Sequence, residues 1–323
     1  MIKYLFRHNK DYSRFNIIKK LLKDLELRND IFILLPFSKN QFFKNFFKRD
    51  KLINDFFISN YDTYVFDRKK ITNKNPRAWW KYFQDWFNFK FSKYLISDTM
   101  AHFKYWETLF GKFAGKHFVL PVLADTSIYY PSKKEINNEK IKILFYGSFI
   151  PLHGIDVILN AFSLMEKNNI SFEANVIGKG QMYSEMKKLH NDLNLKQVSM
   201  NGEVINENQL SDMIREHDII LGIFGESEKA KSVIPNKVYQ STACKKCTVT
   251  MKSDVLKEFY NEEDLITCNN NPESLANALI DLINDKIKIE TISQNAYNQF
   301  NKIYLEAQVN FSKYIKEIDG KLK

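Results

Sequence analysis

The sequence predicts an α/β protein with two doubly wound domains, each built on a parallel sheet. Two observations support this class beyond the length of 323 residues: a polar stretch at 129–140 separates apolar runs, and strand-like and helix-like segments alternate regularly after it. A chain of this length can bury two ordinary cores. We expect domains at 1–134 and 135–300, and a helical segment at 301–323 that packs back on the first domain.

The first domain is predicted from separate apolar segments. Strand patterns occur at IKYLF (2–6), IFILLPF (31–37), YDTYVF (61–66) and KYLISDT (93–99), and FNIIKKLLKDLEL (15–27) has helical periodicity. No glycine-rich loop follows the first strand, so a dinucleotide-binding fingerprint is missing there.

The second domain alternates more regularly, because each of its six strand-like runs is followed by a helix-like run. The strand-like runs are KILFYG (142–147), SFEANVIG (171–178), QVSMNG (197–202), DIILGIFG (218–225), CTVTM (247–251) and LITC (265–268). Strands that alternate with helices of about 10 to 15 residues form βαβ units and a parallel sheet.

Composition predicts a globular cytoplasmic protein, with 44% hydrophobic and 27% charged residues. The apolar runs are far shorter than the roughly 20 residues of a membrane span, and MIKYLFRHNK meets charge too early for a signal peptide. Three cysteines build no disulfide framework. CKKC (244–247) has no second ligand pair for zinc, so we interpret it as the turn between a helix at 236–244 and a strand.

The net charge is distributed unevenly between the two halves. Residues 1–134 carry 26 Lys and Arg against 12 Asp and Glu, a net +14, whereas the remainder carries −4. The stretch SKNQFFKNFFKRDKLINDFF (38–57) sets paired Phe among cations, and as a helix it would suit the surface of an anionic membrane. The alternative is that half of these Phe residues lie in the core and the Lys side chains face water.

Four loops of the second domain are expected at the carboxyl ends of its strands, where parallel sheets bind ligands. They are GSFIPLHG (147–154), GKGQ (178–181), NGEV (201–204) and FGESEKAKSVIPNK (224–237), with six glycines for close backbone approach. Their cations are His153, Lys179, Lys229, Lys231 and Lys237. This composition indicates a ligand rich in phosphate.

VIPNK (233–237) is the most suggestive part of these loops. Proline suits the first turn of a helix and Asn is a good N-cap, so Pro235 and Asn236 predict a helix start. The free N–H groups of that start and the Lys237 ammonium would together hold a phosphate. An ordinary capped surface helix with a solvated Lys is the alternative.

The second domain resembles the donor-binding domain of the group 1, retaining glycosyltransferases with the GT-B fold. The matching stretches are YGSFIPLHGIDVILNAF, VIGKGQMYSEMKK, MNGEV and LGIFGESEKAKSVIPNKVYQSTACKKCTVT. ISDTMAHFKYWETLFG and FVLPVLADTSIYYP in the first domain are similar to segments of the same family. The resemblance implies two domains facing a cleft and transfer of a sugar from a nucleotide-sugar, UDP- or GDP-linked, with retained configuration.

The resemblance also implies a glycan or lipid-linked acceptor, a role in surface polysaccharide or glycoconjugate assembly, and no metal or cofactor. Its donor-binding positions fall on Gly147, Ser148, Phe149, His153, Gly154, Gly178, Lys179, Gly202, Phe224, Gly225, Lys229, Ile234, Pro235, Asn236, Lys237 and Gln240. Lys237 would stabilise the charge that develops on the leaving diphosphate.

Asp98 and His102 in SDTMAH are the expected groups of the first domain. Four apart on a helix, they would share one face, and the His could bind sugar or phosphate or exchange a proton. We expect them to be catalytic together with Lys237. The alternative is an N-cap Asp and a packed His.

The sequence departs from the family pattern at three positions. Ser232 and Gln240 stand where the family has two Glu residues, the second of which binds ribose, and Leu123 replaces a Gly before Asp125. Gln can still hydrogen-bond a ribose hydroxyl. Three other functions stay open: a basic nucleic-acid-binding protein, for which the chain has no recognised module, a catalytically silent nucleotide-sugar binder, and a nucleotide-sugar epimerase.

Overall fold

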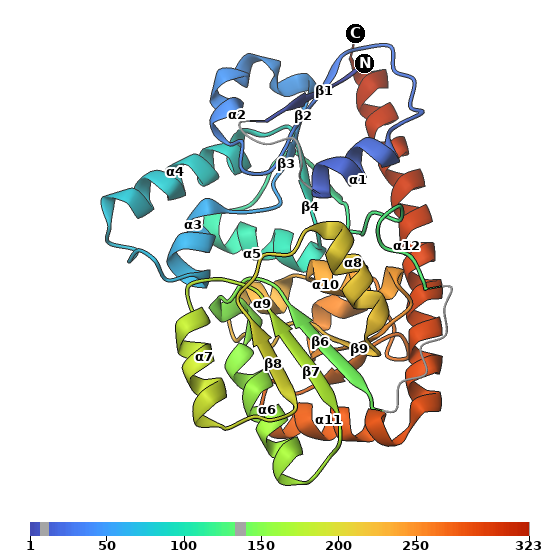
Figure 1. Ribbon diagram of the computed structural model, residues 1–323. Helices are drawn as coiled ribbons and strands as arrows, with labels where there is room; N and C mark the ends of the chain where they lie inside the picture. The colour runs from blue at the N-terminus through green and yellow to red at the C-terminus, as the bar shows by residue number, and fades with distance from the viewer. Residues whose placement is uncertain (7–12, 133–139, 323) are drawn as a thin grey trace. The chain divides into compact units, whose positions relative to one another are not determined.

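The computed structural model describes residues 1–6, 13–132 and 140–322, and the chain divides into two compact units (Figure 1). The first unit contains Met1–Leu123 and Tyr304–Lys323, and the second contains Ala124–Ile303. The division by contacts therefore precedes the polar stretch at 129–140, part of which, 133–139, lies outside the described residues. The long helix α12 (Lys286–Lys321) begins in the second unit, and its last turns belong to the first.

The first unit has a five-stranded parallel sheet in the order β1-β2-β3-β4-β5. The strands are β1 (Ile2–Leu5), β2 (Ile31–Leu34), β3 (Leu52–Asp55), β4 (Tyr94–Ser97) and β5 (Lys116–Val119). The predicted strands β1, β2 and β4 are confirmed, whereas β3 and β5 were not predicted. Strand order here follows chain order, so the reversal of a doubly wound sheet is absent among the described strands of this unit.

Helical segments connect these strands. They are α1 (Ser13–Leu21), α2 (Asn40–Lys44), the 3₁₀ helix η1 (Phe46–Lys51), α3 (Asn60–Asp62), the π-helix η2 (Thr63–Asp67), α4 (Pro76–Phe91) and α5 (Met100–Phe110). Asp319 of α12 accepts hydrogen bonds from the N–H groups of Arg28 and Asn29, at 2.8 and 2.9 Å, and this ties the last turns of α12 to the first unit.

Two predictions for the first unit are wrong. The stretch YDTYVF is helical, because the Ser59 side chain caps α3 by accepting from the Asp62 N–H. The stretch 38–57 is not one helix: after α2 and η1 it enters β3, whose four residues are all buried. Phe42 and Phe56 belong to the core, but Phe47 is almost fully exposed.

The second unit has a six-stranded parallel sheet in the order β11-β10-β9-β6-β7-β8. The strands are β6 (Lys142–Tyr146), β7 (Glu173–Ile177), β8 (Val198–Asn201), β9 (Ile219–Leu221), β10 (Cys247–Met251) and β11 (Ile266–Cys268). All six confirm the predicted strands. The chain builds β6 to β8 in one direction and then returns to add β9 to β11 on the other side of β6, so this sheet is doubly wound.

Helices cover both faces of this sheet. They are η3 (Pro151–His153), α6 (Ile155–Lys167), α7 (Tyr183–Asp192), α8 (Glu207–Glu216), α9 (Glu228–Ser232), α10 (Asn236–Ala243), η4 (Asp254–Glu258), α11 (Pro272–Asn284) and the start of α12. Ile143 and Phe145 of β6 share a core cluster with residues of α6 and α11, which pack on each other. Leu144 and Tyr146 alternate to the opposite face.

Candidate functional site

The loops after β6 and β9 meet at the point where the strand order of the second unit reverses. The Phe224 N–H donates to the His153 carbonyl at 3.1 Å, which joins the two loops. Gly154 has φ +59°, and a Cβ there would lie 2.0 Å from the Phe224 carbonyl oxygen. Only glycine allows this approach. Reversal points of parallel sheets are the usual sites of ligand binding.

Lys237 lies in the first turn of α10, which follows the β9 loop. Its side chain is only 4% exposed, and its Nζ has no hydrogen-bond partner among the described residues. Nζ lies 4.3 Å from the centre of the Phe145 ring. Burial lowers the pKa of Lys237 to about 7. A buried ammonium without a counter-charge is costly, and an anion bound beside it would lower that cost.

Gly147 and His153 adjoin this ammonium. A Cβ on Gly147 would lie 3.0 Å from His153 Cε1 and 3.2 Å from Lys237 Nζ, so all three residues meet at the end of β6. His153 Nδ1 is hydrogen-bonded to the Ser148 carbonyl, which holds the ring in place. The predicted grouping of glycine, His and Lys is therefore present in the structure.

The predicted helix start is shifted by one residue. Pro235 is the N-cap of α10 and Asn236 is the first helical residue, and no side chain caps the end. Asn236 is exposed, whereas Ile234 is buried. Proline cannot donate a backbone hydrogen bond, so its extended conformation fits the position before the helix. An Asn N-cap was the wrong prediction.

Several predicted donor-binding residues support the loops from within. Phe149 and Phe224 are buried in the core, and Gly225 packs against the Leu152 carbonyl, where a Cβ would lie 2.3 Å away. The Gly147 and Phe149 N–H groups donate to the carbonyls of Ile177 and Lys179. Those two N–H groups are thus already bonded, and the exposed Ser148 is the residue of this turn that can meet a ligand.

The loops after β7 and β8 form a pocket beside the same edge. A Cβ on Gly178 would lie 1.8 Å from the Gly147 carbonyl oxygen, and one on Gly202 would lie 2.7 Å from the Tyr183 ring. The pocket has a volume of about 200 Å³. Its lining comprises Tyr146, Gly147, Ser148, Ile177, Gly178, Lys179, Glu203, Val204, Ile205 and Leu210. Lys179 is exposed at its rim.

Gln240 is held inside the second unit. The Tyr146 hydroxyl donates to Gln240 Oε1, and Gln240 Nε2 donates to the Tyr129 hydroxyl, both at 2.9 Å. All three side chains are buried. Contact between Gln240 and a ribose stays a prediction. The two tyrosines were not predicted, because Tyr146 and Tyr129 lie 94 and 111 residues from Gln240 along the chain and no motif connects them to it.

Lys229 and Lys231 lie on the short helix α9 and behave differently. Lys231 is exposed and pairs with Glu228 at 2.9 Å. Lys229 is buried. Lys237 is the predicted lysine whose ammonium the described contacts place beside Gly147 and His153.

Asp98 and His102 of the first unit are in contact, but not through a shared helix face. His102 Nδ1 lies 2.6 Å from Asp98 Oδ1, and both side chains are buried. Asp98 precedes α5, whose N-cap is Thr99, so the two residues do not share a helix face as predicted. A carboxylate oxygen beside Nδ1 favours the tautomer that carries its proton on Nδ1. His102 Nε2 is buried beside Trp106 and has no described hydrogen-bond partner.

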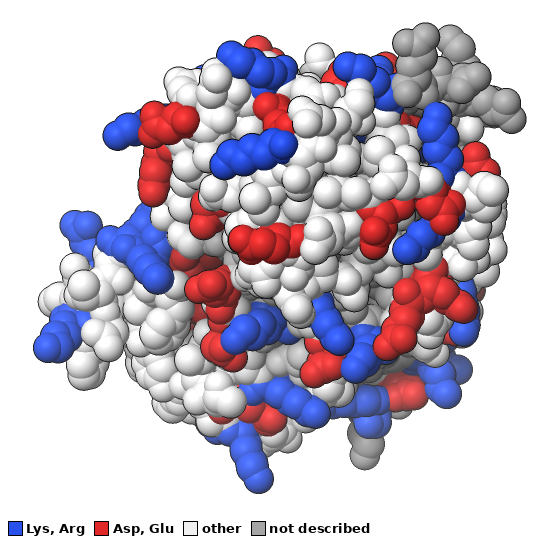
Figure 2. Space-filling model, turned by 90° about the horizontal axis from the view of Figure 1, so that it is seen from below, with Lys and Arg blue, Asp and Glu red and all other residues white. Residues whose placement is uncertain are grey.

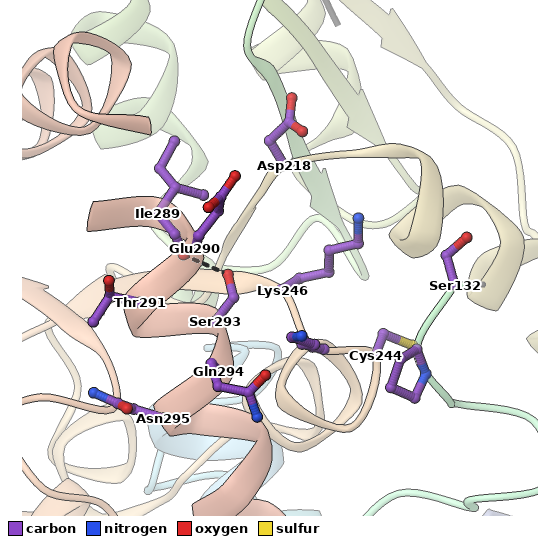
Figure 3. A pocket seen from close by; sticks show the side chains of 12 residues that line it. Ser132, Asp218, Cys244, Lys246, Ile289, Glu290, Thr291, Ser293, Gln294 and Asn295 are labelled. Carbon is purple, nitrogen blue, oxygen red and sulfur yellow. Dashed lines mark hydrogen bonds between the residues drawn. The ribbon is translucent and has the colours of Figure 1, made fainter. Parts of the chain in front are cut away.

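A larger pocket of about 710 Å³ lies at the opposite edge of the second sheet (Figure 3). Lys246 and Asp218 line it just before β10 and β9, and Glu290 and Ser293 line it from the first turns of α12. It therefore lies at the amino ends of the strands, away from the loops described above. Its rim at Ser132 adjoins residues 133–139, which the structure does not describe.

The predicted turn at CKKC is confirmed, since Cys244 is the C-cap of α10 and Cys247 begins β10. Within the described ranges, no three His, Cys, Asp or Glu side chains are grouped to hold a metal ion. No helix among the described residues combines the length and the hydropathy needed to cross a bilayer.

Comparisons with known proteins identify the family of the chain. A model of the family "Glycosyl transferases group 1" matches residues 129–299, more than half of the chain. An uncharacterized glycosyltransferase of Methanocaldococcus jannaschii is 23% identical over 163 residues, which cover 49% of this chain and 42% of that relative. The chain thus spans less than half the length of this curated relative.

Solved structures resemble most of the chain. Sucrose-phosphate synthase of Thermosynechococcus elongatus has a TM-score of 0.69 and 12% identity, with 90% of this chain and 74% of that chain covered. HepE of Anabaena, solved in complex with UDP-glucose, has a TM-score of 0.67 and 15% identity, with 95% and 82% covered. These likenesses show the fold, which is that of GT-B glycosyltransferases with two parallel-sheet α/β domains.

Proposed function

Because this chain belongs to the group 1 glycosyltransferases, we propose that it transfers a sugar from a nucleotide-sugar to a glycan or lipid-linked acceptor with retained configuration. We place this reaction in surface polysaccharide or glycoconjugate assembly, in the cytoplasm at the inner face of the membrane. The observation that carries the proposal is Lys237, a buried ammonium without a described hydrogen-bond partner at the reversal point of the second sheet.

In this proposal the donor diphosphate lies against the first turn of α10. Lys237 supplies a full positive charge, and the free N–H groups of the helix start supply partial charges. The departing nucleoside diphosphate gains negative charge in the transition state, so groups fixed beforehand stabilise it more than they stabilise the bound donor. The scheme requires no metal, because Lys237 and these N–H groups provide the positive charge.

The nucleotide base fits the pocket that adjoins Gly147. Ile205 and Leu210 offer apolar contact there, and Glu203 offers a carboxylate acceptor for the N–H groups of a base. UDP- and GDP-linked sugars are the expected donors. A uracil and a guanine differ in their N–H groups, so Glu203 is the residue through which this pocket would distinguish them.

His102 is proposed to act on the sugar side of the reaction. Asp98 holds the ring in one tautomer, which leaves Nε2 to accept from a sugar hydroxyl or to take a proton. Because His102 is buried, a sugar reaches Nε2 only if neighbouring side chains move aside. His102→Gln tests this role, since the amide can keep a hydrogen bond but cannot exchange a proton.

Thermal unfolding with a panel of nucleotide-sugars tests the donor site. A ligand at about a hundred times its dissociation constant adds about 2.7 kcal/mol, which moves the midpoint of unfolding by several degrees. We expect a selective shift with UDP- or GDP-linked sugars and their free nucleotides. No shift with UDP-, GDP-, ADP- or CMP-linked sugars would contradict the proposal.

A catalytically silent donor binder is the second candidate. Gln240 stands where the family has a ribose-binding Glu, and it is engaged with Tyr129 and Tyr146 instead. Nucleotide-sugars would raise the unfolding midpoint of a silent binder, but such a protein would release no nucleotide from the donor in the presence of acceptor glycolipids. An isomerised nucleotide-sugar formed without any acceptor would instead indicate an epimerase.

A further inference from the structure

A basic segment precedes and enters α4 in the first unit. Residues 68–84 contain six Lys and Arg and no Asp or Glu. Of the six, Lys69, Lys70, Lys74 and Arg77 are exposed. The Asn75 side chain caps α4 by accepting from the Arg77 N–H, so the cations of this loop lead directly into a helix.

Large aromatic side chains are exposed next to these cations. Trp79 is 69% exposed and Trp80 is 58% exposed, and Phe83 and Phe66 are also exposed. Trp80 stacks on Phe83 with ring centres 5.8 Å apart, so the rings form a continuous apolar surface. Two adjacent tryptophans in water are unfavourable, and their exposure indicates a surface that meets a partner.

The acidic residues that flank the segment do not cancel its charge. Asp67 and Asp85, which precede and follow it, are both buried. Asp85 pairs with the buried Lys39 and accepts from the Ser59 hydroxyl at 2.7 Å. The nearest carboxylates in the sequence are thus buried inside the first unit. The exposed charged side chains of residues 68–84 are all positive.

The segment projects from the first unit. In Figure 1 the beginning of α4 and the loop before it extend to the left, and the same projection in Figure 2 shows blue and white atoms without red. A projecting surface can touch a flat partner.

We propose that this projection, residues 68–83, binds the surface of an anionic phospholipid bilayer. Tryptophan rings prefer the boundary between headgroups and acyl chains, where Trp79, Trp80 and Phe83 would insert. Lys69, Lys70 and Lys74 would contact lipid phosphates, and each cation near an anionic surface strengthens binding roughly fivefold. We assign membrane contact to this surface and not to the stretch 38–57, because much of that stretch lies in the core.

The shape favours a bilayer over a nucleic acid. Proteins that bind single strands stack bases in a groove lined by cations. Here the aromatic side chains lie at the projecting start of α4, and cations lie before and beside them. This arrangement suits insertion into the headgroup boundary of a bilayer. Both partners are anionic, so the experiment must separate them.

The site refines the membrane location in the proposed function but needs no donor or acceptor to be tested. Vesicle binding is measured without nucleotide-sugar, so its failure leaves the donor site at Lys237 untouched. Failure of the nucleotide panel would equally leave this surface untouched.

Sedimentation of the full chain with vesicles tests the assignment. We expect binding to vesicles with about one third phosphatidylglycerol, at least tenfold weaker binding to pure phosphatidylcholine, and loss of binding in high salt. Lys69→Gln/Lys70→Gln/Lys74→Gln should weaken binding about a hundredfold. Trp79→Ala/Trp80→Ala should weaken it at least tenfold and abolish the blue shift of tryptophan fluorescence on binding.

The matched control removes the same charge elsewhere. Lys167, Lys188 and Lys196 are exposed on the second unit, and their triple change to Gln should alter binding less than about threefold. Unchanged unfolding midpoints show that the variants fold. The assignment fails if the wild type does not bind anionic vesicles or if the control triple weakens binding equally. Tighter binding to single-stranded RNA, lost in the same two variants, would also overturn it.

Discussion

Lys237 Nζ lies 4.3 Å above the centre of the Phe145 ring, at the end of the strand that begins the second sheet. The ring face attracts the ammonium but carries no net charge, so it positions the cation without neutralising it. The charge therefore remains available to a ligand. A carboxylate in the place of Phe145 would hold the same lysine but would repel a diphosphate.

Lys237→Met should stabilise the protein without ligand near neutral pH. Burial lowers the pKa of Lys237 to about 7, below its unfolded value of about 10.4, so between these values the unfolded state binds more protons. The free energy of unfolding of the wild type therefore rises with pH across that window. We expect the advantage of Lys237→Met to be largest at or below about pH 7 and to shrink towards pH 10. Urea unfolding at several pH values checks this, and an advantage independent of pH would contradict it.

Gly154→Ala should destabilise the second unit by about 2 kcal/mol or more. The new Cβ would lie 2.0 Å from the Phe224 carbonyl oxygen, in a backbone conformation with φ +59°. Gly320→Ala is the matched control, since a Cβ there meets nothing within 4 Å and alanine favours the helix. The control should raise stability by up to about 1 kcal/mol. Equal effects in urea unfolding would show that the two loops do not constrain each other.

Gln240→Leu should cost about 2 kcal/mol, because it leaves the buried hydroxyls of Tyr129 and Tyr146 without their shared partner. Tyr146→Phe removes one of the two hydrogen bonds and should cost about 1 kcal/mol. Urea unfolding of both variants and of the double variant measures the coupling. If the costs of the single changes simply add, the three side chains do not form one network.

The three thiols should resist modification in the folded protein. Burial raises the pKa of Cys244 to about 11 and the pKa values of Cys247 and Cys268 to about 12, so little thiolate exists near pH 8. A thiol reagent such as DTNB should label none of them before denaturation and all three afterwards. Rapid labelling of Cys244 and Cys247 in the folded state would restore a redox role for CKKC.

The second unit could be predicted almost completely from the sequence, and the first unit could not. Each strand of the second unit is followed by a loop with glycine or a polar break, so its boundaries are visible. In the first unit, β3 follows directly after the 3₁₀ helix η1, with no glycine or proline between them. YDTYVF has the aromatic and β-branched residues of a strand, yet the Ser59 cap and tertiary packing make it helical.

The site was predictable in its residue types but not in their orientation. Lys237, His153 and Gly147 meet as expected, because the order of strands and loops determines where they lie. The inward orientation of Gln240 depends on Tyr129 and Tyr146, which no local pattern connects to it. Leu123, which replaces a family glycine, nevertheless keeps φ +60°, so the backbone conformation survived where the residue type did not.

The affinity of Lys237→Met for UDP and GDP, measured by calorimetry at about pH 7, directly tests whether Lys237 binds the diphosphate. Loss of a charge-assisted contact to the diphosphate should weaken binding at least tenfold. Lys188→Met, an exposed lysine on α7, should bind as the wild type does. Wild-type affinity should also fall as pH rises from about 7 to 9, because binding requires the protonated ammonium. An unchanged dissociation constant in Lys237→Met would contradict the placement of the diphosphate at the start of α10.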